Sequence, residues 1–141
     1  MILLPDVNVW IALTSDRHVH HTLARQWLQT TEQDRLVFCR ISEMGFLRLL
    51  TNAHVMGNDV LSPLEAWRIY GEWRADGRVL FVPERIGFNE DWQRMGRQVS
   101  AGPNAWTDAY LAAFALHVGA TIVTFDRRFL PLGSVSIHYL G

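Results

Sequence analysis

Short apolar runs alternate with longer segments of helical periodicity, and this alternation predicts the secondary structure of the chain. The apolar runs are bounded by polar or turn-forming residues, as is typical of buried strands. Between them, apolar residues recur at the spacing of one helix face. The expected strands cover residues 2–5, 36–39, 79–82, 121–125 and 135–139. The expected helices cover a turn at 9–13 and the segments 18–30, 42–50, 62–76, 89–99 and 105–118.

Residues with capping side chains mark three of the expected helix starts. Ser62 is followed by Pro63 and then by Glu65, which is the capping-box pattern with proline at the first helical position. Ser42 and Asn89 are expected to cap the helices that follow them. Two segments are expected to lie between elements, a loop at residues 52–59 and a turn at residues 131–133.

Strands that alternate with helices predict an α/β fold with a mainly parallel sheet of four to five strands and helices on both faces. The 141 residues suffice for one packed core and not for two ordinary domains, so we expect a single domain over residues 1–141. Asp6 interrupts the apolar start, and no run approaches the roughly 20 apolar residues of a membrane span. The single cysteine, Cys39, allows no intramolecular disulfide. A cytoplasmic protein without membrane association is therefore expected.

Charge and composition mainly exclude certain classes of function. The formal net charge is -1, so RNA contacts would have to come from local patches or metal ions and not from a global positive field. All 13 basic residues are arginine. The absence of lysine excludes a Walker-type phosphate loop and Schiff-base chemistry, and it argues against aspartyl-phosphate enzymes.

Four acidic residues stand where parallel sheets bind ligands, at strand ends and helix starts. Asp6 and Asp126 end expected strands, while Glu43 and Asp108 lie in the first turns of expected helices within otherwise apolar surroundings. Each residue alone also fits a structural role, as a strand terminator or as a charge that complements a helix dipole. Together they point to a shared site, because clustered carboxylates raise one another's pKa and a divalent cation removes that conflict.

The ligand chemistry of such a cluster favours a hard cation. The expected donors are all oxygens, so Mg²⁺ or Mn²⁺ is the predicted ion. A carboxylate-bound Mg²⁺ can orient a phosphate, lower the pKa of a bound water and stabilise a leaving oxygen. The predicted chemistry is therefore hydrolysis of a phosphodiester bond.

Four motifs in order along the chain resemble those of PIN domains, and most closely those of the VapC toxin ribonucleases of bacterial VapBC toxin–antitoxin pairs. The motifs are Asp6-Val7-Asn8, Ser42-Glu43, Thr107-Asp108-Ala109-Tyr110-Leu111-Ala112-Ala113 and Thr124-Phe125-Asp126-Arg127-Arg128-Phe129. The resemblance spans nearly the whole chain. It implies a PIN-like fold and a magnesium-dependent endoribonuclease that acts on RNA, is inhibited by a small VapB-like antitoxin and forms a homodimer.

The resemblance also assigns roles to individual residues. The acidic quartet, with catalytic and metal-binding roles, would be Asp6, Glu43, Asp108 and Asp126, of which Asp6 and Asp108 rank first as ligands. The polar supporting positions would be Asn8, Thr107 and Thr124. Ala112 stands where some relatives carry a further acid, so the resemblance leaves open whether one or two metal ions bind.

Other residues are open to structural or functional interpretation. Arg127 and Arg128 directly follow Asp126 and are candidates for binding substrate phosphates, although paired arginines also occur in solvated turns. His18, His20 and His21 are expected to be exposed or to contact RNA or antitoxin, and a second metal site is disfavoured. Trp67 and Trp73 are candidates for a groove that binds a partner peptide.

Two rival functions remain. An aspartyl-phosphate phosphatase would place its nucleophile at Asp6, but the chain lacks lysine and has Asn8 where such enzymes use a second aspartate. A non-catalytic RNA- or protein-binding module on the same fold is the other rival. Covalent phosphorylation of Asp6 would support the phosphatase, and metal-independent RNA binding without cleavage would support the module.

Overall fold

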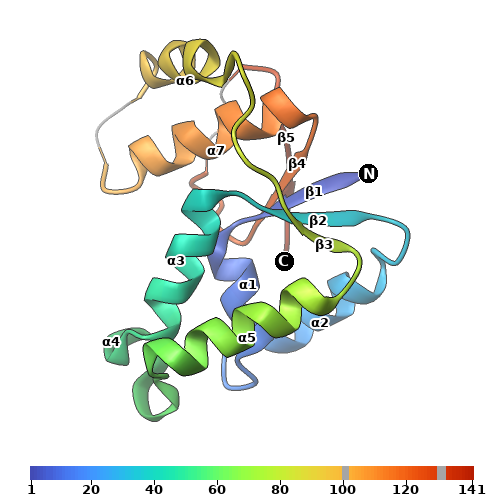
Figure 1. The fold of residues 1–141 in the computed structure, drawn as a ribbon, viewed down its shortest axis with the longest axis vertical. Helices are drawn as coiled ribbons and strands as arrows, with labels where there is room; N and C mark the ends of the chain where they lie inside the picture. The colour runs from blue at the N-terminus through green and yellow to red at the C-terminus, as the bar shows by residue number, and fades with distance from the viewer. Residues whose placement is uncertain (100–101, 130–132) are drawn as a thin grey trace.

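The strands of the chain form one parallel sheet in a computed structural model, which describes residues 1–99, 102–129 and 133–141 (Figure 1). The strand order is β3-β2-β1-β4-β5, and every neighbouring pair is parallel. The strands are β1 (Ile2–Pro5), β2 (Arg35–Phe38), β3 (Val79–Phe81), β4 (Thr121–Thr124) and β5 (Ser136–Tyr139). The predicted mainly parallel sheet is confirmed.

Helices cover both faces of this sheet, as predicted. Figure 1 shows α6 and α7 on one side of the sheet and α1, α2, α3 and α5 on the other. The helices are α1 (Val7–Thr14), α2 (His21–Gln29), α3 (Arg40–Leu50), α4 (Ala53–Met56), the 3-10 helix η1 (Gly57–Asp59), α5 (Pro63–Ala75), α6 (Phe88–Gly96) and α7 (Ala105–Val118). Within the described ranges, none of these helices is long and apolar enough to cross a bilayer.

The strands are apolar throughout because successive side chains pack into two different cores, one on each face of the sheet. Leu3 on β1 and Val123 on β4 pack into the core beneath α1, α2, α3 and α5. Leu4 and Ile122, their neighbours in sequence, pack into the core formed with α6 and α7. Because side chains alternate between the faces of a strand, a sheet covered on both faces needs an unbroken apolar run.

The helix α3 begins earlier than its capping residue predicted. Its first residue is Arg40, and Cys39 occupies the N-cap position. The hydroxyl of Ser42 lies inside the first turn and accepts a hydrogen bond from the backbone N–H of Cys39 at 3.0 Å. Ser42 therefore caps the helix from its third position, and the prediction that the helix starts after Ser42 was wrong. The chain passes from β2 into α3 with one intervening residue.

Two further local predictions were wrong. Asn89 lies within α6, which begins at Phe88 after Gly87, and the positive φ of +90° at Gly87 is a conformation that glycine adopts without strain. The buried ring of Phe88 anchors this start. Residues 52–59, expected to be a loop, form α4 and η1, because the side chain of Asn52 caps α4 by accepting the His54 N–H at 2.9 Å.

The capping box at α5 is confirmed. The Ser62 hydroxyl accepts the Glu65 N–H at 3.2 Å, and the Glu65 carboxylate accepts the Ser62 N–H at 3.0 Å. The helix runs to Ala75, close to its predicted end. The turn expected at residues 131–133 lies largely outside the described residues.

Candidate active site

The carboxyl ends of β1 and β4 bring Asp6 and Asp126 to the same edge of the sheet. These strands are neighbours, with Pro5 opposite Val123. The backbone N–H of Asp6 extends the pairing by donating to the Val123 carbonyl at 2.8 Å. Asp126 follows two residues after the end of β4. Parallel strand ends thus create the juxtaposition that the sequence predicted.

Asp6 is fixed at this edge by both of its carboxylate oxygens. As the N-cap of α1, its Oδ1 accepts the Val7 N–H at 2.7 Å. Its Oδ2 accepts the hydroxyl of Thr124 at 3.1 Å. The same hydroxyl oxygen accepts the N–H of Asp126 at 3.0 Å. The buried Thr124 therefore ties the first and last acids together, in agreement with the supporting position that the resemblance assigned to it.

Asp108 enters the site from the first turn of α7, a helix whose following residues are almost all buried. Burial and then the negative charges of Asp6 and Asp126 raise the pKa of Asp108 to about 6, against the opposing charge of Arg128. These mutual effects mean that the three carboxylates share one electrostatic environment. Two acids from strand ends and one from a helix start converge, as expected.

The pKa values of the other two carboxylates, Asp6 and Asp126, are shifted in opposite directions. Burial raises the pKa of Asp6 above its ordinary value, against hydrogen bonds from Val7 and Thr124, and the charge of Asp126 adds to the increase. The backbone N–H of Arg128, at 2.9 Å from Asp126 Oδ1, holds the pKa of Asp126 below its ordinary value. Asp126 is therefore a fixed negative charge beside two acids that resist ionisation.

This donor set fits a divalent cation that keeps part of its water shell. In the described ranges, no three Asp, Glu, His or Cys side chains stand close enough to ligate one ion together. Mg²⁺ is usually bound by one or two carboxylates and several waters, so direct ligation by Asp6 and Asp108 with the remainder through water is compatible with the arrangement. A cation there also stabilises the ionised forms of these two carboxylates, which burial and then neighbouring negative charge disfavour.

Glu43 lies in a different electrostatic environment from the three aspartates. It is 7% exposed, and its Oε1 accepts a hydrogen bond from Arg40 Nη1 at 2.5 Å. Burial and the neighbouring Glu43 carboxylate raise the pKa of Tyr70 to about 12. Glu43 is not among the charges that act on Asp6 or Asp108. The structure thus joins three members of the expected quartet and pairs the fourth with its own arginine.

The remaining candidates occupy varied positions. Asn8 is exposed on α1, two residues after Asp6, and Thr107 is exposed in the first turn of α7. The guanidinium of Arg128 donates through Nε to Asp126 Oδ1 at 3.1 Å, and its side chain is 88% exposed. The guanidinium of Arg127 instead lies over the ring of Tyr139. Arg128 is therefore the arginine placed beside the carboxylates.

A surface pocket of about 330 Å³ adjoins the carboxylates. Its lining residues are Asn8, His18, His20, Phe125, Asp126 and Arg128. The ring of His20 stacks on Phe125, with centroids 4.5 Å apart. Sequence analysis did not single out Phe125, although its position between Thr124 and Asp126 places it at the site.

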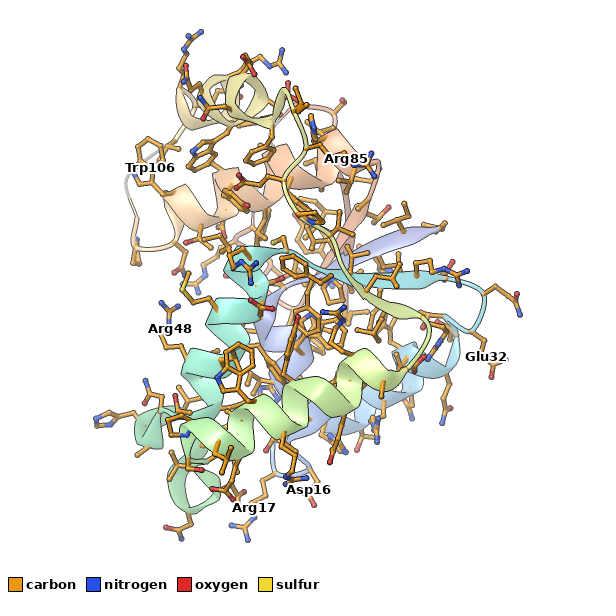
Figure 2. The ribbon with its side chains drawn as sticks, viewed as in Figure 1. Asp16, Arg17, Glu32, Arg48, Arg85 and Trp106 are labelled. Carbon is orange, nitrogen blue, oxygen red and sulfur yellow. The ribbon has the colours of Figure 1, made fainter. Side chains whose placement is uncertain are left out.

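Two tryptophans proposed for partner binding differ in role. The indole of Trp73 donates to the Thr14 hydroxyl at 2.9 Å and packs edge-on against Trp10, so the assignment of Trp73 to an open groove was wrong. Trp67 is half exposed. Elsewhere, Trp106 lies on the outer side of α7 against Trp92, as Figure 2 shows, and not among the pocket's lining residues.

Comparison with known proteins places this chain in a family. Residues 3–133 match the model of the PIN domain. The chain belongs to the PIN-domain family. It is 39% identical to Ribonuclease VapC41 of Mycobacterium tuberculosis, over 99% of both chains, and 31% identical to Ribonuclease VapC38 of the same species, over 92% of this chain and 88% of that one.

Solved structures agree on the fold. The VapBC2 structure from Rickettsia felis bound to a promoter DNA fragment has a TM-score of 0.73 at 11% identity and covers all of both chains. The VapC20 structure from Mycobacterium tuberculosis, described as a toxin that cleaves the sarcin-ricin loop, has a TM-score of 0.61 at 17% identity. It covers 90% of this chain and 92% of that one.

Proposed function

We propose that this protein is a divalent-metal-dependent endoribonuclease and the toxin of a type II toxin–antitoxin pair. The observation that carries the proposal is the convergence of Asp6, Asp108 and Asp126, two of them with raised pKa values, at the carboxyl edge of the sheet. The similarity over nearly the whole chain to proteins named as VapC ribonucleases supports the reaction class.

In this proposal Asp6 and Asp108 hold Mg²⁺ or Mn²⁺. Thr124 orients Asp6 through the 3.1 Å hydrogen bond, and the same hydroxyl holds the backbone of Asp126. When held by these two residues, such an ion would supply positive charge against the scissile phosphate and would lower the pKa of a water at the site. Asp126, kept ionised by Arg128, accepts a proton from the attacking water or orients that water through a hydrogen bond.

Arg128 is the proposed contact for the substrate backbone. Its Nε is used by Asp126, but the side chain is 88% exposed, so the rest of the guanidinium faces solvent beside the carboxylates. Arginine binds phosphate oxygens through such a fork. A local cation of this kind is what a chain of net charge -1 requires to hold RNA next to an acidic cluster.

A small antitoxin protein is the proposed regulatory partner, and a homodimer the proposed assembly. Several structures with this fold are VapBC complexes, including VapBC-1 of nontypeable Haemophilus influenzae at a TM-score of 0.67. On this chain, Leu64 and Trp67 on α5 and Met44 on α3 are exposed apolar residues on helices that pack against each other. Such residues suit the apolar face of an amphipathic peptide. Light scattering tests the dimer against the chain mass of 16.2 kDa.

The decisive experiment is cleavage of a mixed RNA pool by the purified protein with Mg²⁺, with Mn²⁺ and with EDTA. Asp6→Asn is the catalytic control, because an amide ligates Mg²⁺ poorly and changes the packing little. We expect cleavage that requires the metal and is absent from the variant, which should keep the circular dichroism spectrum of the parent.

The outcomes separate the rival functions. Cleavage that persists in EDTA or in Asp6→Asn would contradict the proposed site. RNA binding without cleavage under either ion would favour the binding module. Covalent phosphorylation of Asp6 by a phosphate ester would favour the phosphatase.

A further inference from the structure

The pocket beside the carboxylates has features that the proposed hydrolysis does not use. It extends from Asp126 to the connection between α1 and α2, which supplies His18 and His20. The proposed hydrolysis uses neither histidine, and the ring of Phe125 stacks on that of His20. The pocket therefore offers contacts to a part of the substrate next to the reacting phosphate.

An aromatic platform forms one part of the pocket. The His20 and Phe125 rings are nearly parallel, with an interplanar angle of 12° and a centroid separation of 4.5 Å. His20 is exposed, and the ring of His18 is tilted by 43° to it with centroids 5.8 Å apart, so a further planar group can reach the His20 ring from solvent. A stack of this kind extended by a nucleobase is the common arrangement in proteins that bind single-stranded RNA.

Local hydrogen bonds hold this platform in place. The Nδ1 atom of His18 accepts the backbone N–H of His20 at 3.0 Å, which leaves Nε2 of a neutral His18 as a donor. The ring of His21 is bonded to the Ala12 carbonyl at 2.7 Å and ties the connection to α1. The segment thus presents a stacking face, a ring donor and, from Asn8, an amide with both donors and acceptors.

The two charged side chains that line the pocket are bonded to each other, since Arg128 Nε donates to Asp126 Oδ1 at 3.1 Å. Burial and the neighbouring histidines hold the pKa of His18 below its ordinary value, so this ring is uncharged at neutral pH. A nucleobase is planar and neutral and bears donors and acceptors along its edge, so it suits the aromatic ring of His20 and the amide of Asn8.

We propose that the pocket lined by Asn8, His18, His20 and Phe125 binds one nucleobase of the RNA substrate, stacked on His20, next to the scissile phosphate. This inference rests on the proposed ribonuclease function. Because Asp126 belongs both to the pocket and to the carboxylate cluster, a base held here belongs to a nucleotide that flanks the cleaved bond. The pocket would then contribute to sequence preference.

The test compares RNA that carries bases with RNA that lacks them. The probes are fluorescent oligoadenylate and oligouridylate of about 12 nucleotides and an abasic ribose–phosphate chain of equal length. Binding is measured by anisotropy in an Asp108→Asn background, which prevents cleavage. His20→Ala removes the platform, His20→Tyr preserves an aromatic ring, and His54→Ala on α4 is the matched control at an exposed histidine outside the pocket.

We expect His20→Ala to weaken binding of at least one base-bearing probe about tenfold and to leave abasic binding unchanged, since one stacked base contributes on that scale. His20→Tyr should restore the affinity, and His54→Ala should match the parent. Equal loss for all three probes, or no loss for any, would overturn the proposal. Failure of the tyrosine to restore binding would also overturn it.

The binding readout is independent of the cleavage assay. Metal-dependent cleavage together with unchanged binding by His20→Ala would leave the ribonuclease and remove the base pocket. Base-dependent binding that is lost in His20→Ala, without cleavage by the parent, would keep the pocket and remove the ribonuclease.

Discussion

Glu43 and Asp108 occupy equivalent places, each in the first turn of a helix that begins at or near the carboxyl edge of the sheet, but their charges are compensated differently. Glu43 is buried and receives a hydrogen bond from Arg40 at 2.5 Å. Burial, and then the charges of Asp6 and Asp126, raise the pKa of Asp108 to about 6 although Arg128 opposes them. Glu43 therefore has a bonded countercharge, whereas like charges outweigh the opposing charge at Asp108.

Glu43 has a partner within the chain, whereas Asp6 and Asp108 would be neutralised by a bound cation. Glu43 is compensated within the chain by Arg40, whose side chain is 64% exposed, so the loss of this pair mainly affects stability. Like charges drawn together by the fold cost free energy, and strongly perturbed carboxylates of this kind concentrate at functional sites. The trio of Asp6, Asp108 and Asp126 is therefore where a divalent cation has the most to contribute.

The largest expected effect compares the two kinds of acid in RNA cleavage. Asp6→Asn and Asp108→Asn should each reduce kcat/KM at least about 1000-fold, since a catalytic metal contributes several kcal/mol to the transition state. Glu43→Gln should reduce it only about tenfold, because Glu43 is held by Arg40. Cleavage rates of the three variants on one RNA with Mg²⁺ test this ranking. If Glu43→Gln were as inactive as Asp6→Asn, Glu43 would not differ from the aspartates in its role.

Mg²⁺ binding should stabilise the folded protein, and variants of the same residues should differ in how much of this stabilisation they keep. At a Mg²⁺ concentration about 100 times the Kd, the folded protein gains about 2.7 kcal/mol, which corresponds to a rise in Tm of roughly 5–10 °C. Asp6→Asn and Asp108→Asn should lose most of this rise, and Glu43→Gln should keep it. Calorimetry with and without Mg²⁺ measures the shift, and Ca²⁺-free EDTA buffer provides the baseline. An equal loss in Glu43→Gln would place Glu43 among the ligands.

Removing the countercharge of Glu43 should destabilise the protein. In Arg40→Ala a buried carboxylate loses its charged hydrogen bond, and Phe81 loses the guanidinium that lies 4.5 Å above its ring. We expect a loss of about 2 kcal/mol in the free energy of unfolding. Arg48→Ala is the control, because Arg48 projects from the outer side of the same helix, as Figure 2 shows, and should change stability by less than about 0.5 kcal/mol.

Urea titration distinguishes these two variants. A similar midpoint for Arg40→Ala and Arg48→Ala would show that Glu43 does not depend on Arg40. It would then weaken the contrast between Glu43 and the aspartates.

The sequence predicted the sheet and the convergence of three acidic side chains, because both follow from the order of strands and helices along the chain. Apolar runs mark strands buried on both faces, and acids at the ends of parallel strands meet at one edge. Asp6 and Asp126 follow from this rule, and Asp108 follows from the helix before β4. These positions need no knowledge of side-chain contacts.

Partners from distant segments could not be predicted in the same way. Thr124 contacts Asp6 across 118 positions of sequence, and His20 stacks on Phe125 from another element, so only the assembled fold brings them together. Arg40 and Glu43 are only three positions apart, but the side-chain conformations that bring them into hydrogen-bond contact cannot be read from the sequence. The N-caps of α3 and α6 are Cys39 and Gly87, which signal a helix start less clearly in a sequence than serine or asparagine does.

The smallest expected effect is a pH dependence of stability without divalent ions. The folded-state pKa of Asp108, about 6, lies above its ordinary value of 3.8, so the folded state binds its proton more tightly than the unfolded state. The Asp108 contribution is thus most favourable at low pH and is lost as pH rises from about 4 to about 6. Because Asp108 is partly exposed, solvent screening reduces the loss to about 1 kcal/mol.

The measurement is the difference in unfolding free energy between the parent and Asp108→Asn in EDTA across that pH range. The parent should become progressively less stable relative to the variant until about pH 6 and then hold a constant difference. Asp6, whose pKa is also raised, should give a change of the same sign in Asp6→Asn. A flat pH profile for both variants would mean that Asp6 and Asp108 are already compensated within the chain, and the cation site would lose its electrostatic basis.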